Sequence, residues 1–190
     1  MINIIGGIYK GTKLDVPKNG VRPTSAIKRE AIFSILESYA SKNQYDLYKN
    51  NCFLDLFAGS GSFGLEAISR GASFSYFFEI NNNIKEVLLI NCKKICKKNQ
   101  FNIYQQDSTS LDNKNFFYPV SVIFIDPPYK LNPFNNLLNQ FIKQNILNDK
   151  TIIVIEANKK TSIELDKEFI IIKEKQYGKT KIIFLKKKLG

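Results

Sequence analysis

Four consecutive residues in the second half of the chain, Asp126-Pro127-Pro128-Tyr129, combine groups that could act on an amine. An exocyclic amine on a base is a poor nucleophile because its lone pair is delocalised into the ring. The Asp126 carboxylate and the backbone carbonyl of Pro127 offer two acceptors that would draw such an NH2 group towards tetrahedral geometry. The prolines fix φ and lack an N–H, so this backbone is stiff and presents only acceptors. Tyr129 offers a ring on which an extruded base can stack, and catalysis would be chiefly positioning.

A glycine-rich turn, AGSGSFG, lies in the first half of the chain between an apolar strand pattern and a helix pattern. Gly59 and Gly61 permit a tight turn and let the backbone approach a ligand. Glu79 ends the next strand pattern, 20 residues after Gly59, a spacing that suits a carboxylate accepting the two hydroxyls of a ribose. The turn also fits the G-x-G-x-x-G string of dinucleotide enzymes, in which a helix N-terminus binds a pyrophosphate.

Two further carboxylates favour S-adenosylmethionine over a dinucleotide. Asp55 precedes the turn inside the strand, where it could meet an ammonium group but would repel a pyrophosphate. Asp107 ends a third strand pattern, where an adenine amino group could donate to it. The cofactor contacts predicted from these motifs are Asp55, Gly59, Gly61, Glu79 and Asp107.

These motifs lie on alternating strand and helix patterns. Apolar runs predict strands at 52–57, 74–80, 101–107, 120–126 and 151–157, and two final strands within 169–187 joined by a turn at Gly178. Helices are expected at 63–71, 81–99 and 132–145. Strands that are apolar on both faces predict a parallel sheet covered by helices, with an antiparallel hairpin at one edge. Ligands bind such sheets beyond the carboxyl ends of the strands.

The N-terminal segment has a different pattern. Residues 2–14 predict a short β-hairpin with glycines at the turn, and KNGVRPTS predicts a loop. A helix follows through 28–40, with Ser25 or Thr24 as its N-cap. We expect residues 1–45 to form an N-terminal hairpin-and-helix extension, and residues 46–190 to form the domain that carries the motifs described above.

Composition bounds the choice of partners. The chain of 190 residues carries a net charge of +11, which favours polyanions, although solubility or biased composition would also produce it. Its longest apolar runs are strand-sized and far from the ~20 residues of a membrane span, so we expect a cytoplasmic protein without a membrane partner. Three cysteines are too few for a disulfide framework, and the absence of histidine excludes a Cys/His zinc site, so no metal is expected.

Two motifs together, LDLFAGSG and FIDPPY, are similar to the amino-methyltransferases that modify adenine N6, guanine N2 or cytosine N4. The segments IIGGIYKGTKLDVP and RPTSAIKREAIFSIL narrow this to a resemblance to the RsmD family, which methylates N2 of one guanine in bacterial small-subunit (16S) ribosomal RNA. The resemblance spans nearly the whole chain. It implies a Rossmann-like class I methyltransferase fold, with a seven-stranded, mostly parallel sheet, an antiparallel edge hairpin and a small N-terminal hairpin-and-helix extension.

The resemblance also implies S-adenosylmethionine as donor and small-subunit ribosomal RNA or an assembling 30S particle as partner, with a monomer expected. Carried over by motif, Asp126, Pro127, Pro128 and Tyr129 would be catalytic. The same carry-over adds Phe57, Ala58, Ile80 and Ser108 to the predicted cofactor contacts, which makes nine. The substrate side would hold Arg22, Pro23, Thr24, Arg29 and Lys130, and an electrostatic RNA footprint would add Lys10, Lys13 and Lys28. The family usually continues RPT-x-D-R-V-R-E, whereas Ala26 and Ile27 stand here in place of the Asp and the first Arg. This departure concerns substrate contacts more than chemistry.

Three alternatives stay open at this point. DNA adenine-N6 methyltransferases usually carry an added target-recognition domain, for which 190 residues leave little room. Protein-glutamine methyltransferases share the chemistry but usually have Asn in place of Asp126. A basic nucleic-acid-binding protein without catalysis would not need the intact DPPY.

Overall fold

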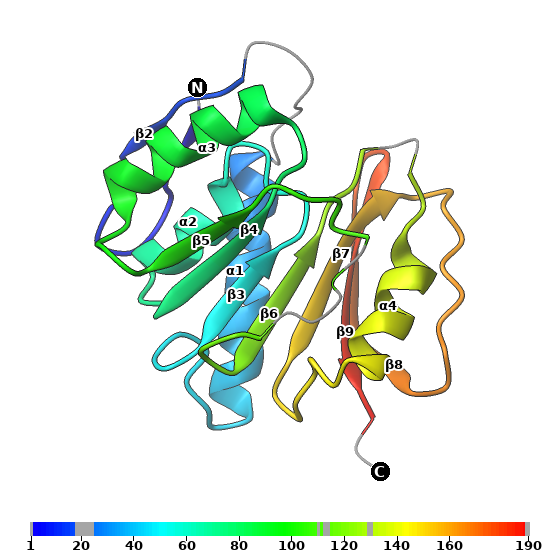
Figure 1. Cartoon of the computed structure of the whole chain (residues 1–190). Helices are drawn as coiled ribbons and strands as arrows, with labels where there is room; N and C mark the ends of the chain where they lie inside the picture. The colour runs from blue at the N-terminus through cyan, green and yellow to red at the C-terminus, as the bar shows by residue number, and fades with distance from the viewer. Residues whose placement is uncertain (1, 18–24, 110, 112–114, 129–130, 189–190) are drawn as a thin grey trace.

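The computed structural model describes residues 2–17, 25–109, 111, 115–128 and 131–188 (Figure 1). Its centre is a seven-stranded sheet in the order β5-β4-β3-β6-β7-β9-β8. The first five strands in this order run parallel, and β9 pairs antiparallel with both β7 and β8. The strands are β3 (Cys52–Asp55), β4 (Phe74–Phe78), β5 (Phe101–Tyr104), β6 (Val120–Ile125), β7 (Ile152–Asn158), β8 (Phe169–Tyr177) and β9 (Thr180–Lys187). This confirms the predicted fold class, including the antiparallel edge.

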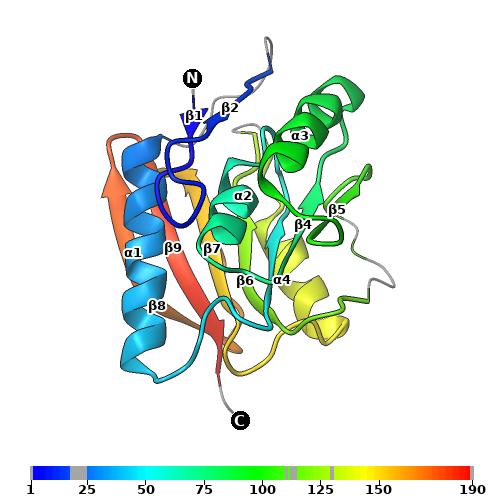
Figure 2. The same cartoon turned by 90° about the vertical axis from the view of Figure 1, so that its left-hand side faces the viewer.

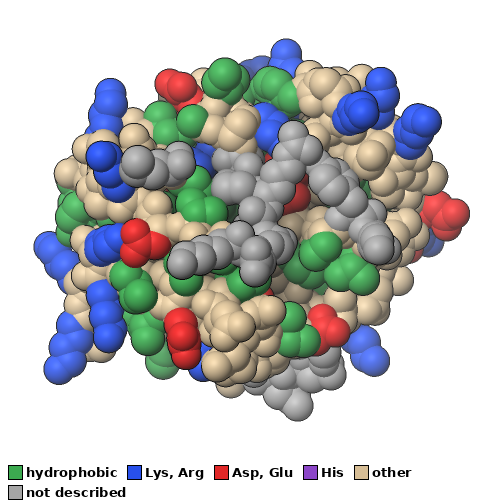
Figure 3. Space-filling model, turned by 90° about the horizontal axis from the view of Figure 1, so that it is seen from above, with side chains coloured by type: hydrophobic (Ala, Val, Ile, Leu, Met, Phe, Trp, Pro, Cys, Tyr) green, Lys and Arg blue, Asp and Glu red, His purple; other side chains and the backbone are tan. Residues whose placement is uncertain are grey.

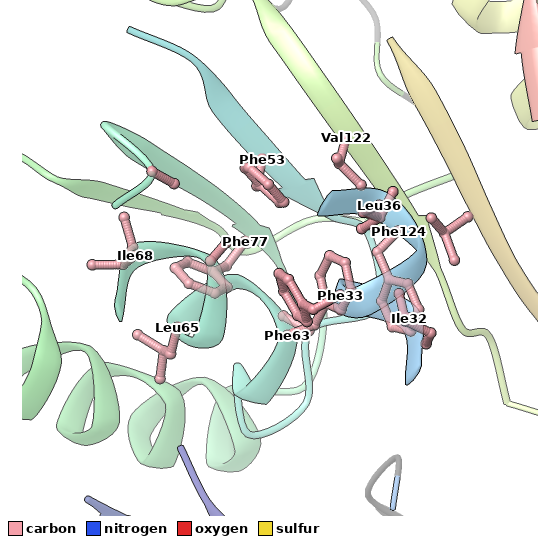
Figure 4. Close-up of a cluster of buried hydrophobic side chains, with 14 of the residues drawn as sticks. Ile32, Phe33, Leu36, Phe53, Phe63, Leu65, Ile68, Phe77, Val122 and Phe124 are labelled. Carbon is pink, nitrogen blue, oxygen red and sulfur yellow. The ribbon is translucent and has the colours of Figure 1, made fainter. Parts of the chain in front are cut away.

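Helices cover both faces of this sheet. The helices α1 (Ala26–Lys42), α2 (Ser62–Ser69) and α3 (Asn82–Ile95) pack on one face, and α4 (Phe134–Lys143) packs on the other (Figures 1 and 2). The core accordingly consists of two clusters of buried apolar side chains, one on each face. On the first face, the ring of Phe63 from α2 stacks on Phe124 of β6 at 4.0 Å and lies 4.9 Å from Phe33 of α1 (Figure 4).

The order of the strands fixes where a ligand can bind. From β3 the chain runs outward through β4 to β5, and then returns to the other side of β3 to form β6 and β7. The direction of winding therefore reverses between β3 and β6. In open sheets of this kind, the crevice beyond the carboxyl ends of the strands at such a switch point is the usual binding site.

The N-terminal segment packs against the helices of the first face. Strand β1 (Ile2–Asn3) pairs antiparallel with β2 (Lys13–Leu14), which confirms the predicted hairpin. The loop between them lies on the C-terminal end of α2, where the N–H of Ile8 donates to the Ser69 carbonyl at 2.8 Å. Gly7 has a φ of 74°, and a Cβ there would lie 1.8 Å from that carbonyl oxygen, so the approach requires glycine. The division into segments 1–45 and 46–190 stays a prediction.

Among the described residues, no helix has the length and apolarity to cross a bilayer. The same residues contain no group of three or more Cys, Asp or Glu side chains that could hold a metal ion. Cys92 is buried and Cys96 is partly buried, both as free thiols.

Candidate cofactor and acceptor site

A cavity of about 500 Å³ lies beyond the carboxyl ends of the parallel strands. Pockets that enclose a ligand of drug size typically measure ~300–1,000 Å³, so this cavity can hold one. Its walls come from the segments that follow β3, β4, β5 and β6, together with one side chain of β7 and one of α1. Figure 3 views the molecule from above, on the side where β6 and β7 end, and shows Lys and Arg side chains spread around the margin of this face.

The turn after β3 supplies backbone donors and brings the chain into the cavity. Ala58, Gly59 and Ser60 line the wall, and the N–H of Ala58 donates to the Phe78 carbonyl at 3.0 Å, which ties the turn to the end of β4. Gly61 does not line the cavity. It has a φ of 77° at the N-cap of α2, and a Cβ there would lie 2.3 Å from a methyl carbon of Leu88. The structure therefore gives Gly61 a role in packing α2 against α3.

Glu79 lies directly after β4 and is held from two sides. Its Oε2 accepts the N–H of Gly59 at 3.1 Å, and its Oε1 accepts the N–H of Asn81 at 2.8 Å. Both bonds come from backbone, so the carboxylate has a fixed direction at the cavity wall. Each oxygen has a further lone pair with which it can accept a hydroxyl group of a ligand.

Asp55 is the last residue of β3 and is only 2% exposed. Burial raises the pKa of its carboxyl group to about 7, and the nearby charge of Glu79 acts in the same direction. The N–H of Gly64 donates to its Oδ2 at 3.3 Å and opposes this rise in pKa. A carboxyl group in this state gains most from a cationic partner, which would favour its ionised form.

The third carboxylate, Asp107, lies beyond the end of β5, and its Oδ1 accepts the N–H of Thr109 at 2.8 Å. Of the nine predicted cofactor contacts, all except Gly61 line the cavity; they are Asp55, Phe57, Ala58, Gly59, Glu79, Ile80, Asp107 and Ser108. Among the described lining residues at and beyond the ends of β3, β4 and β5, there are three carboxylates and neither Lys nor Arg. This set of groups suits a ligand with hydroxyl groups, an amino group and positive charge, and it disfavours a pyrophosphate.

The other side of the cavity holds the described part of the predicted catalytic motif. Asp126, Pro127 and Pro128 follow β6 and line the wall together with Phe124. The structure therefore brings the predicted catalytic and cofactor groups to a single cavity. The predicted residues Arg22, Pro23, Thr24, Tyr129 and Lys130 lie outside the described residues.

Arg29 corrects an expectation drawn from the sequence. It was expected on the substrate side, but it is 0% exposed and does not line the cavity. Its Nη2 donates to the Asn3 carbonyl, and its Nε lies 3.6 Å from Oε2 of the equally buried Glu66. Glu66 also accepts Nε of Arg70 at 2.9 Å and the N–H groups of Ile5 and Gly6 at 2.8 and 2.7 Å. Arg29 thus joins α1 to α2 and to the N-terminal hairpin.

Two charged residues of the cavity wall were not predicted as part of the site. Lys28, in the first turn of α1, forms an ion pair with Glu156 of β7, and both side chains line the cavity. The sequence held one signal for Glu156, which is an acidic residue inside the apolar run TIIVIEA. Lys28 was expected only as part of an electrostatic RNA surface.

Comparison with known proteins identifies the family. A family model described as "Conserved hypothetical protein 95" matches residues 2–186. The chain belongs to this family. Among its relatives, the protein named ribosomal RNA small subunit methyltransferase D in Buchnera aphidicola (subspecies Acyrthosiphon pisum) is 36% identical, and the match covers 92% of this chain and 87% of that protein. The protein of the same name in Haemophilus influenzae is 30% identical, with coverage of 93% and 89%. The resemblance to the RsmD family is thereby confirmed.

A solved structure shows the same architecture. The structure titled putative methyltransferase yhhF from Escherichia coli has a TM-score of 0.82 at 26% identity, and the match covers 98% of this chain and 97% of that one. The similarity therefore includes the N-terminal segment as well as the sheet.

Proposed function

We propose that this protein transfers a methyl group from S-adenosylmethionine to the exocyclic N2 amine of a guanine in bacterial small-subunit ribosomal RNA. The observation that carries the proposal is the single cavity that holds Asp126-Pro127-Pro128 on one side and the carboxylates of Asp55, Glu79 and Asp107 on the other. The curated relatives named ribosomal RNA small subunit methyltransferase D support the substrate class. Such a substrate would place the protein in the bacterial cytoplasm.

The groups after β3, β4 and β5 would hold the cofactor. S-adenosylmethionine, when bound, supplies a methyl group activated by a sulfonium. Glu79, fixed by Gly59 and Asn81, would accept the ribose hydroxyls. Asp55, buried and with a raised pKa, would ionise against the ammonium group of the methionine part. Asp107 would accept the amino group of the adenine.

The groups after β6 would prepare the acceptor. The Asp126 carboxylate and the Pro127 carbonyl would each accept one N–H of the guanine amine and direct its lone pair towards the methyl carbon. Methyl transfer would form the C–N bond as the C–S bond of the bound donor breaks and its sulfonium charge is neutralised, and Asp126 would accept the proton that the nitrogen then loses. These residues act by orientation, which is the main source of rate in a transfer between two bound groups.

Contacts with RNA phosphates would supply affinity without sequence choice. Lys10 and Lys13 are exposed on the N-terminal hairpin, within a chain of net charge +11. Arg22, Pro23, Thr24, Tyr129 and Lys130 remain predicted substrate contacts. Binding is expected to weaken steeply as salt rises, since each neutralised phosphate releases counterions.

The test is a methyl-transfer assay with labelled S-adenosylmethionine and small ribosomal subunits from cells that lack this gene. The RNA is then digested and the modified nucleoside identified and mapped. N2-methylguanosine at one position is the expected product. Label in DNA or in protein, with none in ribosomal RNA, would contradict the proposed substrate. Cofactor binding without label in any acceptor would favour a non-catalytic RNA-binding protein.

A further inference from the structure

The ion pair of Lys28 and Glu156 lies in the cavity wall without a role in the function proposed above. The Glu156 side chain is 5% exposed and that of Lys28 is 17% exposed. The Lys28 ammonium group donates to Oε1 of Glu156. A charge inside an apolar strand is costly to bury even when it is paired, and pairs of this kind are weak evidence of a contribution to stability. Their place in a binding cavity therefore invites a functional explanation.

Strand register places Glu156 next to the catalytic motif. The strands β6 and β7 are parallel, with Phe124 paired to Val154 and Ile125 to Ile155. Asp126 is the first residue after β6 and Glu156 is the next residue of β7, and neighbouring strands lie about 4.8 Å apart. Phe124 and Val154 both belong to the core cluster on the face covered by α1.

Because side chains alternate along a strand, Glu156 points to the same face as Val154. Lys28 reaches it from the first turn of α1, which Ser25 caps by accepting the N–H of Lys28 at 3.3 Å. The cavity therefore has an acceptor and a donor fixed side by side, on the strand next to the one that ends at Asp126.

The order of these hydrogen-bonding groups along the cavity wall matches the order of polar groups along one edge of one base. The Watson–Crick edge of guanine presents, in order, the N2 amine, the N1–H donor and the O6 acceptor. Adenine and cytosine instead present their amine next to a ring nitrogen that is an acceptor, which a carboxylate would repel. Enzymes that extrude a base read it by hydrogen bonds to this edge.

We propose that Glu156 accepts the N1–H of the target guanine and that Lys28 donates to its O6, so that this ion pair selects guanine while Asp126 and Pro127 hold the N2 amine. The inference rests on the proposed function and adds the residues that determine the base. A site built to pair with polar groups rejects analogues that lack them far more strongly than an apolar pocket does, because its own buried groups would stay unpaired.

The test uses an analogue that keeps the reacting amine. Once the methylated position has been mapped, small-subunit RNA is assembled by ligation with either guanine or 2,6-diaminopurine at that position. The analogue retains the 2-amino group but has an acceptor at N1 and an amine in place of O6. The wild-type protein is expected to have a kcat/KM on the analogue that is lower by roughly 100-fold or more.

Two variants locate the cause of this discrimination. Glu156→Gln is expected to lower kcat/KM on guanine by roughly 10- to 100-fold and to lower it much less on the analogue, because an amide can donate to the bare N1. Lys28→Met is expected to reduce the ratio of kcat/KM on guanine to kcat/KM on the analogue in the same way. The matched controls are Glu174→Gln, exposed on β8, and Lys42→Met, exposed in the last turn of α1, which should leave the ratio as in the wild type.

Cofactor affinity and the midpoint of thermal unfolding are measured for every variant. An equal loss of kcat/KM on both RNAs that accompanies a loss of thermal stability would overturn the inference. The ion pair would then be a structural link between α1 and β7. If Glu156→Gln does not fold, the ratio measured with Lys28→Met decides, and an unchanged ratio would overturn the inference. A wild-type protein that methylates guanine without rejecting the analogue would overturn it while sparing the proposed function. Absence of methylation on the guanine RNA would overturn both.

Discussion

The two sides of the cavity are held by different kinds of contact. On the cofactor side, each carboxylate accepts a backbone N–H from its own or an adjacent turn, as Glu79 does from Asn81 and Asp107 from Thr109. On the acceptor side, Glu156 is held by Lys28, which lies 128 residues earlier on a helix above the sheet. A site fixed by local backbone can be recognised from a short motif, whereas a site fixed by a distant side chain cannot.

The largest expected effect tests whether the two sides work separately. Asp126→Ala should lower kcat by about 100- to 1,000-fold, because it would remove one of the two groups that we propose to orient the amine. The affinity for S-adenosylmethionine should stay unchanged, since the cofactor carboxylates follow β3, β4 and β5. Single-turnover assays and calorimetry measure the two quantities. Asp149→Ala, an exposed residue in the turn before β7, is the control. A parallel loss of cofactor affinity would mean that the two sides are coupled.

A second prediction concerns the packing of α1, the helix that positions Lys28 on the acceptor side of the cavity. Arg29→Met should lower the free energy of unfolding by about 3 kcal/mol, since it leaves the buried Glu66 with Arg70 as its remaining cationic partner. Urea denaturation measures this effect, and Glu30→Gln on the exposed side of the same turn is the control. Unchanged stability together with weaker RNA binding would return Arg29 to the substrate surface.

On the cofactor side, Glu79→Ala should weaken S-adenosylmethionine binding by roughly 10- to 100-fold, the effect of losing hydrogen bonds to a charged group. At saturating cofactor, kcat should change little, in contrast to the result for Asp126. Calorimetric titration measures the affinity. Glu86→Ala, exposed on α3, should bind as the wild type does. If kcat fell at saturating cofactor, Glu79 would also act on the acceptor.

The smallest expected effect is a dependence on pH. With the Asp55 carboxyl group at a pKa of about 7, the neutral form dominates below that pH and cannot pair with the ammonium group. Cofactor affinity should therefore fall by up to about tenfold per pH unit below 7 and should level off above it. Asp55→Asn should bind weakly at every pH. A flat profile for the wild type would remove Asp55 from the ammonium subsite.

The raised pKa of Asp55 makes folding stability depend on pH in the opposite direction to cofactor affinity. In the ligand-free protein, the folded state retains a proton on Asp55 that the unfolded chain, with an ordinary pKa near 3.8, has released. Stability is therefore expected to decrease as pH rises from about 4 to 7, while cofactor affinity increases. A fall in the unfolding midpoint together with a rise in cofactor affinity across this range would indicate Asp55, because other groups are expected to affect only one of these two quantities.

Local patterns predicted most of the fold and the three carboxylates that line one side of the cavity. Alternating apolar runs and turn glycines located the strands β3 to β9 and the helices between them, because both signals depend on residues close in sequence. The positions of Asp55, Glu79 and Asp107 followed from the rule that ligands bind at strand ends.

The same patterns could not predict contacts between side chains that are far apart in the sequence. Arg29 next to Glu30 has the appearance of an exposed charged turn, and nothing near it indicates Glu66, 37 residues further on, as its buried partner. Glu156 is a lone acid in an apolar strand, a signal that the sequence analysis did not use, and its partner Lys28 becomes evident only when α1 is placed on the sheet. For Gly61, a turn with positive φ was predictable, whereas the side chain of Leu88 that it faces was not.

The attachment of the N-terminal hairpin has a consequence for how the chain matures during its own synthesis. The N–H groups of Ile5 and Gly6 donate to Glu66, and that of Ile8 donates to Ser69, so these residues pair with residues that a ribosome adds some sixty positions later. The hairpin must therefore wait, undocked, until α2 has been synthesised. Docking of the hairpin therefore requires that α2 has formed, and a product that ends before Glu66 lacks the surface on which the hairpin could dock.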